Sequence, residues 1–120
     1  MTSAATRLLL VEDDPAIRSA LLGALQHAGF EALGAADAAE ALSILARHRV
    51  AVVVADYHLP GIVGLDLLAA IRGATPGAVL ILYSGGMTDG RAEEAREFSV
   101  RAVLEKPVSA ERLIKVMRSV

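Results

Sequence analysis

The sequence of 120 residues contains no cysteine and no tryptophan, and it has only two tyrosines and two phenylalanines. The lack of cysteine excludes disulfide bonds, thiolate metal sites and a cysteine nucleophile. Because aromatic residues are few while 54% of all residues are hydrophobic, the core must consist mainly of Leu, Val, Ile and Ala side chains. High hydrophobicity with modest charge excludes an intrinsically disordered chain.

The sequence also lacks an excess of charge of either sign and any long hydrophobic run. Its 12 Lys and Arg residues nearly balance 14 Asp and Glu, and the net charge is −2. No basic stripe supports nucleic-acid binding, no apolar run approaches a membrane span, and the first residues do not resemble a signal peptide. We therefore expect a cytoplasmic protein without direct contact to nucleic acid or membrane. Residues 1–6 are expected to form a short flexible N-terminus and residues 7–120 a single domain.

Five short apolar runs alternate with five longer helical patterns. The predicted strands are 8–11, 30–35, 50–55, 79–83 and 102–104, and the predicted helices are 15–28, 38–47, 64–72, 89–98 and 109–120. Three of the runs are continuously apolar, which is typical of parallel strands covered on both faces, and 30–35 predicts a weaker edge strand. The alternation predicts an α/β fold with helices on both faces of one parallel sheet.

Local signals support the predicted helix ends. Asp14, Asp37 and Ser109 each stand where an N-cap is expected, and Glu40 completes the spacing of a capping box with Asp37. Three residues of the first helix and three of the last are expected to share one buried face in each helix: Ile17, Leu21 and Leu25, then Leu113, Met117 and Val120. The fourth helix, 89–98, has few apolar residues and follows several glycines, so we expect it to have low local stability.

Chemically useful side chains stand at the ends of four predicted strands. Glu12 and Asp13 follow the first, Asp56 the third, Ser84 the fourth and Lys106 the fifth. Each alone has an ordinary explanation as a capping, turn or solvated residue. In an open parallel sheet, however, the carboxyl ends of the strands form the binding edge, where these groups would meet.

Carboxylates gathered at one point repel one another unless a cation neutralises them. Oxygen ligands without cysteine or clustered histidine favour Mg²⁺ over zinc, and the lysine and the hydroxyl suit a phosphoryl group. Because neither a Walker loop nor a dinucleotide-binding glycine motif is present, the nucleophile would be a carboxylate that forms an aspartyl phosphate.

Four segments in this order resemble the receiver domain of two-component response regulators over residues 6–120. They are Leu8 to Pro15, Val52 to Gly61 with Gly64, Ser84-Gly85, and Glu105-Lys106-Pro107. The resemblance implies a flavodoxin-like (βα)5 sandwich, doubly wound, with strand order 2-1-3-4-5.

The resemblance also implies roles for single residues. Asp56 would be the phosphoacceptor. Asp13 and Asp56 would ligate Mg²⁺, Glu12 would act mainly through a bound water, and the backbone carbonyl of His58 would complete the ligands.

For the phosphoryl group, the resemblance implies binding and switching by Ser84, Gly85 and Lys106, with a cis peptide bond before Pro107. Receiver domains often carry an aromatic switch residue three positions before the lysine, and Val103 occupies that position here. Because a β-branched side chain has little rotamer freedom, we expect no switching at Val103.

The leading hypothesis is therefore a phosphorylation switch that is not a turnover enzyme. A histidine kinase or a histidine phosphotransfer protein would donate the phosphoryl group, and an unknown output partner would bind a surface on the fourth helix, fifth strand and fifth helix. One alternative is a pseudo-receiver that acts as an interaction module without phosphorylation. A Mg²⁺-dependent phosphatase would need a general acid or base beside Asp56, and the sequence indicates none. The sequence leaves open the cognate kinase, the pathway, the phosphoryl lifetime, the oligomeric state, and whether the domain stands alone or belongs to a longer protein.

Overall fold

A computed structural model describes residues 6–85 and 98–120 of the chain. Its helices and strands, in chain order, are β1 (Arg7–Val11), α1 (Pro15–His27), β2 (Glu31–Ala35), α2 (Ala38–Arg47), β3 (Val52–Asp56), α3 (Gly64–Ala74), β4 (Val79–Ser84), β5 (Val100–Glu105) and α5 (Ala110–Arg118). The predicted helix 89–98, apart from its last residue, and nearly all of the predicted flexible N-terminus lie outside the described residues.

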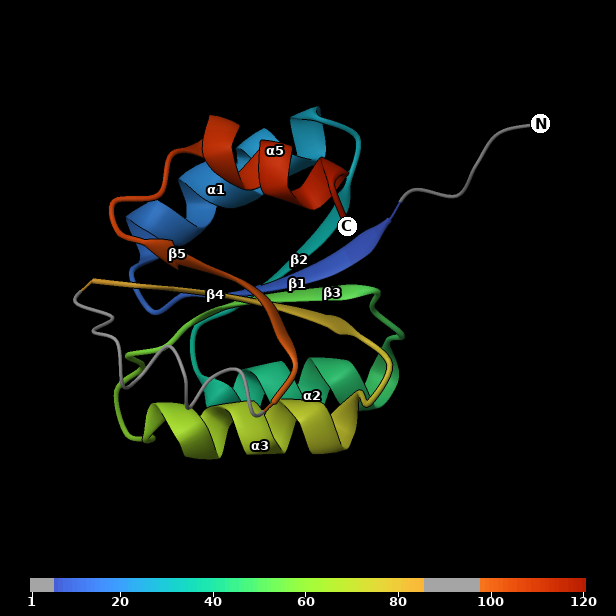
Figure 1. Cartoon of the computed structure of the whole chain (residues 1–120), viewed down its shortest axis with the longest axis vertical. Coiled ribbons are helices and arrows are strands. Elements are labelled where there is room, and N and C mark those ends of the chain that lie inside the picture. Colours follow the sequence, from blue (N-terminus) through green and yellow to red (C-terminus); the bar gives the residue numbers. More distant parts are fainter. Residues whose placement is uncertain (1–5, 86–97) are drawn as a thin grey trace.

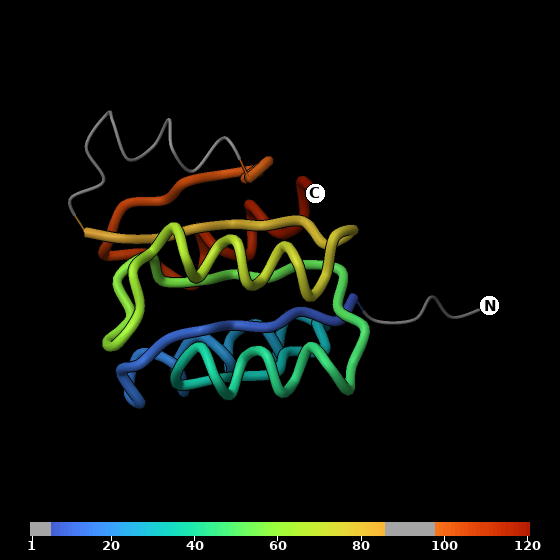
Figure 2. The backbone as a smooth tube through the Cα atoms, turned by 90° about the horizontal axis from the view of Figure 1, so that it is seen from below, coloured from blue at the N-terminus to red at the C-terminus, as the bar shows by residue number. Residues whose placement is uncertain are grey.

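The five strands form one parallel sheet in the order β2-β1-β3-β4-β5, as expected. Figure 2 shows β1, β3, β4 and β5 following one another in blue, green, yellow and orange. The weak apolar run that predicted an edge strand is β2, which does lie at the edge.

Helices cover both faces of the sheet. Figure 1 shows α1 and α5 on one face and α2 and α3 on the other. Alternate residues of the strands enter two separate hydrophobic clusters: Leu9, Val53 and Leu82 pack toward α2 and α3, whereas Leu10 and Val54 pack toward α1 and α5. Burial on both faces explains why three of the five apolar runs, those of β1, β3 and β4, are continuous.

The three predicted N-caps are present. Asp14 Oδ1 accepts hydrogen bonds from the Ala16 and Ile17 N–H groups, Asp37 Oδ1 accepts from the Glu40 N–H, and Ser109 Oγ accepts from the Arg112 N–H. In the capping box, the reciprocal bond to Glu40 Oε1 comes from the Ala36 N–H at 3.3 Å, one residue before the cap. These caps satisfy N–H groups that a helix leaves without internal partners.

Two predicted core residues are wrong. Ile17 is 41% exposed and Val120 is 39% exposed. Ile17 lies in the first turn of α1, where it lines a surface pocket with Pro107 and Val108 instead of entering the core. Val120 lies beyond the end of α5 at Arg118, so the helical periodicity no longer directs its side chain inward.

Strand β5 (Val100–Glu105) is longer than the predicted strand 102–104. Its start was not predicted because the alternation of its residues is interrupted. Val100 pairs with Leu80 and Ala102 pairs with Ile81, which leaves Arg101 as an extra residue at an irregularity in the ladder. A bulge of this kind breaks the two-residue period from which a strand is predicted. Smaller differences occur at β3, which begins at Val52, and at α3, which continues to Ala74.

Within residues 6–85 and 98–120, no helix is both long and apolar enough to cross a bilayer.

Candidate functional site

Three carboxylates meet at the carboxyl ends of β1 and β3. One oxygen from each of Glu12, Asp13 and Asp56 lies within 4.8 Å of the others. Glu12 and Asp56 are buried, while Asp13 is exposed. The structure therefore brings together the three acidic side chains that the sequence placed at separate strand ends.

Lys106 supplies the positive charge of the site. Its Nζ lies 2.7 Å from Asp56 Oδ2 and 3.5 Å from Glu12 Oε1. Backbone pairing places the lysine there, because the Lys106 N–H donates to the Ser84 carbonyl at 3.0 Å just beyond the ladder between β4 and β5. The next peptide bond, Lys106–Pro107, is cis.

The environment of Lys106 favours its charged form. Partial burial alone would lower its pKa, but the hydrogen bond and negative charge of Asp56, together with the charge of Glu12, raise the pKa of Lys106 above its ordinary value. The lysine therefore remains an ammonium ion throughout the neutral range.

Asp56 is held through both of its carboxylate oxygens. Oδ1 accepts a hydrogen bond from the His58 N–H at 2.9 Å, and Oδ2 accepts the bond from Lys106. The loop that follows turns through Gly61, whose φ of 82° lies in the left-handed region that favours glycine. At Gly64 the Tyr57 ring approaches so closely that a Cβ would lie 2.6 Å from it. Two glycines thus allow the chain to fold tightly around Asp56.

Glu12 has a partner that the sequence analysis did not identify. The Tyr83 hydroxyl donates to Glu12 Oε1 at 2.9 Å, while Glu12 Oε2 accepts from the Asp14 N–H at 3.0 Å. Burial, followed by the nearby charge of Glu12, raises the pKa of Tyr83 far above its ordinary value, so its hydroxyl remains protonated. The only signal in the sequence is a phenol at the end of an otherwise aliphatic strand, directly before Ser84.

The remaining predicted residues lie around this cluster. Ser84 is buried at the end of β4, and its hydroxyl donates to the Gly85 carbonyl at 3.1 Å. Val103 is half-buried in β5 opposite Leu82, and the alternation of the strand places it on the other face of the sheet from Leu104. The expected turn of Ser84 toward a phosphoryl group would occur in the phosphorylated protein, and it stays a prediction.

The donors at this site fit Mg²⁺. All of its acidic ligands offer oxygen, and three carboxylates with one ammonium leave a formal charge of −2 that one divalent cation neutralises. Asp13 is exposed and therefore accessible to a hydrated ion, which suits a metal that keeps several of its waters.

Comparison with known proteins agrees with this geometry. The family model "Response regulator receiver domain" matches residues 8–118. The response regulator protein FleR of Pseudomonas aeruginosa is 38% identical over 114 residues, which are 94% of this chain and 24% of FleR. The transport regulatory protein DctD of Rhizobium meliloti is 33% identical over 116 residues, covering 97% of this chain and 25% of DctD. The chain thus spans about a quarter of the length of these relatives.

Solved structures show the same fold. The chemotaxis protein CheY4 of Vibrio cholerae matches with a TM-score of 0.90 and 27% identity, covering 98% of this chain and 99% of that one. A CheY-like receiver domain protein of Methanospirillum hungatei also gives a TM-score of 0.90, with 26% identity over 96% of this chain and 92% of its own. With residues 8–118 matched and the sheet order shared, the chain belongs to the response regulator receiver domain family.

Proposed function

We propose that this domain is a phosphoryl-accepting switch, in which Asp56 takes a phosphoryl group from a phosphohistidine in a reaction that requires Mg²⁺. One observation carries the proposal: buried Asp56 lies between an ammonium group at 2.7 Å and two further carboxylates that share its oxygen cluster. A carboxylate can act as a nucleophile toward phosphorus, and the surrounding charges match the needs of phosphoryl transfer.

In the proposed reaction, an Asp56 carboxylate oxygen forms a bond to phosphorus as the bond from phosphorus to the histidine nitrogen breaks. The electron pair of the broken bond stays on the imidazole. Asp13 and Asp56, with Glu12 through water and the His58 carbonyl, would hold Mg²⁺, which supplies positive charge beside the phosphoryl oxygens when bound. Lys106 already contacts one Asp56 oxygen, so it needs only a small displacement to pair with a transferred phosphoryl oxygen.

Phosphorylation would affect the rest of the domain through residues at the ends of the strands. We propose that Ser84 and Gly85 rearrange toward the phosphoryl group and that phosphorylation shifts an existing two-state equilibrium. The partner surface would comprise the fourth helix, which lies outside the described residues, together with β5 and α5. Residues 7–120 would act as one domain that assists its own phosphorylation without being a turnover enzyme. The donor would be a histidine kinase or a histidine phosphotransfer protein.

Intact mass after incubation with acetyl phosphate tests the proposal. Wild-type protein should gain one phosphoryl group in Mg²⁺ and none in EDTA, whereas Asp56→Asn should gain none in either buffer. Asp66→Asn is a matched control, because Asp66 is an exposed carboxylate in the first turn of α3, and it should behave as wild type. Absence of an adduct in folded wild-type protein, with no binding of beryllofluoride, would instead favour an interaction module that is not phosphorylated.

A further inference from the structure

Tyr83 borders the site, yet the proposed phosphoryl transfer does not use it. It is 2% exposed, and its ring packs in the cluster beneath α1 and α5. Its hydroxyl lies 2.9 Å from Glu12 Oε1 and 3.4 Å from the Val11 carbonyl. Its ring centroid lies 5.2 Å from Lys106 Nζ. One side chain thus contacts both an acidic residue and the basic residue of the site.

The Tyr83 side chain connects two strands that are not neighbours in the sheet. Tyr83 belongs to β4 and pairs with Asp56 on β3, whereas Glu12 follows β1 on the far side of β3. Since neighbouring strands are about 4.8 Å apart, the Tyr83 and Glu12 side chains together bridge a distance of about 10 Å across β3. A shorter side chain on β4 would leave Glu12 without this donor.

A buried tyrosine needs a hydrogen-bond partner for its hydroxyl, and a backbone carbonyl would be sufficient for that purpose. The Val11 carbonyl is within reach, but the shorter bond is made to the Glu12 carboxylate, which is the stronger acceptor. Because Glu12 Oε2 is held by the Asp14 N–H, the Tyr83 bond fixes the second oxygen and therefore the plane of the carboxylate. The contact is thus made with a group of the proposed metal site.

Glu12 Oε1 is also the oxygen that lies 3.5 Å from Lys106. Without the hydroxyl, this oxygen would lose its nearest donor and turn toward the ammonium group. Lys106 would then be shared more evenly between Glu12 and Asp56, and its positive charge would oppose a cation at Glu12.

We propose that Tyr83 is a positioning residue of the Mg²⁺ and phosphoryl site: its hydroxyl fixes the Glu12 carboxylate and its ring supports Lys106 beside Asp56. This inference rests on the proposed function and names a residue that orients its charged groups. Hydrogen-bond partners of metal-site residues commonly change metal affinity by tenfold or more when removed. Since Glu12 is expected to act through water, the loss here should be about three- to tenfold.

Tyr83→Phe deletes only the hydroxyl, and Tyr57→Phe deletes the same atom from the other tyrosine of the chain. Calorimetric titration with Mg²⁺ should give a dissociation constant about three- to tenfold higher for Tyr83→Phe and one close to wild type for Tyr57→Phe. Phosphorylation by acetyl phosphate should need correspondingly more Mg²⁺ in Tyr83→Phe, while its rate at saturating Mg²⁺ approaches that of wild type. A merely structural role would lower the denaturation midpoint in EDTA without changing these constants.

Equal Mg²⁺ affinity in Tyr83→Phe and wild type would overturn the inference, and so would equal losses in both tyrosine variants. Failure of the proposed function is distinguishable, because wild-type protein would then bind Mg²⁺ without gaining a phosphoryl group. The affinity comparison would still decide the role of Tyr83. Tyrosine fluorescence gives an independent reading, since the chain has no tryptophan: in Tyr57→Phe the Mg²⁺-dependent signal must come from Tyr83.

Discussion

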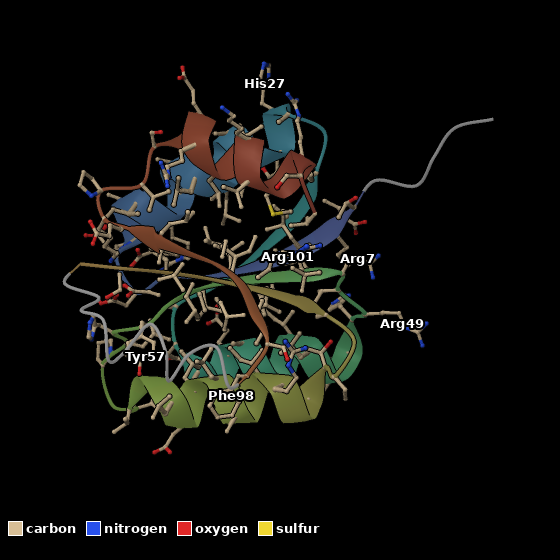
Figure 3. The ribbon with its side chains drawn as sticks, viewed as in Figure 1. Arg7, His27, Arg49, Tyr57, Phe98 and Arg101 are labelled. Atoms are coloured by element: carbon tan, nitrogen blue, oxygen red, sulfur yellow. The ribbon has the colours of Figure 1, made fainter. Side chains whose placement is uncertain are left out.

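Charged side chains have different surroundings at the two ends of the sheet. At the carboxyl ends of the strands, Glu12 and Asp56 are buried and share one lysine. At the amino ends, Figure 3 shows Arg7 and Arg49 on the side of the molecule away from Tyr57. Arg49 and Arg101 are exposed, and the pair between Arg7 and Glu31 at 3.0 Å has side chains that are 36% and 48% exposed.

This difference shows where charge matters in the molecule. The exposed charges of Arg49 and Arg101 and the partly exposed Arg7–Glu31 pair keep much of their hydration, so their interactions contribute little to stability. Charges at the carboxyl ends have lost much of their water, and only their mutual pairing offsets that loss. This loss of hydration fits the proposed binding of a cation and a phosphoryl group at the carboxyl ends. Variants at the two ends of the sheet should reveal the contrast.

The largest effect is expected when Lys106 is removed. Lys106→Met leaves two buried carboxylates without their cation, so the free energy of unfolding in EDTA should fall by about 2–3 kcal/mol. Mg²⁺ should restore part of this loss, because a bound cation replaces the missing charge and stabilises the folded state. Arg49→Met, the same change at the other end, should shift stability by no more than about 0.5 kcal/mol.

Urea denaturation of both variants, with and without Mg²⁺, measures these differences. Equal losses in the two variants would show that the site does not depend on compensation between buried charges. A loss in Lys106→Met that Mg²⁺ leaves unchanged would count against a metal at the carboxylate cluster.

The two ends of α3 give a second contrast. An added Cβ at Gly64, beside the site, would meet the Tyr57 ring at 2.6 Å, whereas at Gly73, near the other end, nothing lies within 4 Å. Gly64→Ala should therefore destabilise the protein by about 2 kcal/mol through overpacking. Gly73→Ala should be neutral or stabilise it by up to about 1 kcal/mol, since alanine favours the helix. Thermal denaturation compares the two, and a stable Gly64→Ala would mean that the ring moves away freely.

The sequence predicted the parts of the molecule that depend on local pattern. The positions of Asp56 and Lys106 followed from the ends of apolar runs, and the cap at Asp14 followed from its neighbour Pro15. The bond between Tyr83 and Glu12 was not predicted because it crosses an intervening strand, and no spacing along the chain encodes that distance. The start of β5 was not predicted because Arg101 adds one residue to the ladder and breaks the alternation. Periodicity thus locates strands and their ends, while contacts across strands require the assembled sheet.

Alkaline pH should lower the stability of the protein through the groups at the carboxyl ends of the strands. The pKa of Tyr83 is raised from 10.0 and that of Lys106 from 10.5, so both groups contribute stability below those values that is lost as pH rises through their folded-state pKa values. For Tyr83, whose phenol faces Glu12, Asp56 and Asp13, the loss should be about 1 kcal/mol between pH 10 and 11.

Urea denaturation between pH 8 and 11 measures this slope, and Tyr83→Phe should make it shallower. Ultraviolet absorption of ionised tyrosine provides the matching observation in Tyr57→Phe, where Tyr83 should ionise only as the protein unfolds. Ionisation near pH 10 in the folded protein would contradict the buried hydrogen bond.

The smallest effect on the site itself is expected at Val103, which lies within β5 between the two ends. Its side chain is half-buried on the same face of the sheet as that of its partner Leu82. Val103→Ala should therefore cost about 1 kcal/mol of stability through lost packing. Because valine has little rotamer freedom, this change should leave Mg²⁺ affinity and the rate of phosphorylation by acetyl phosphate nearly unchanged. Urea denaturation and intact mass, measured on the same preparation, separate the two effects. A strong loss of phosphorylation or of partner discrimination at unchanged stability would show that Val103 takes part in switching, and would extend the sensitive region from the ends of the strands into β5 itself.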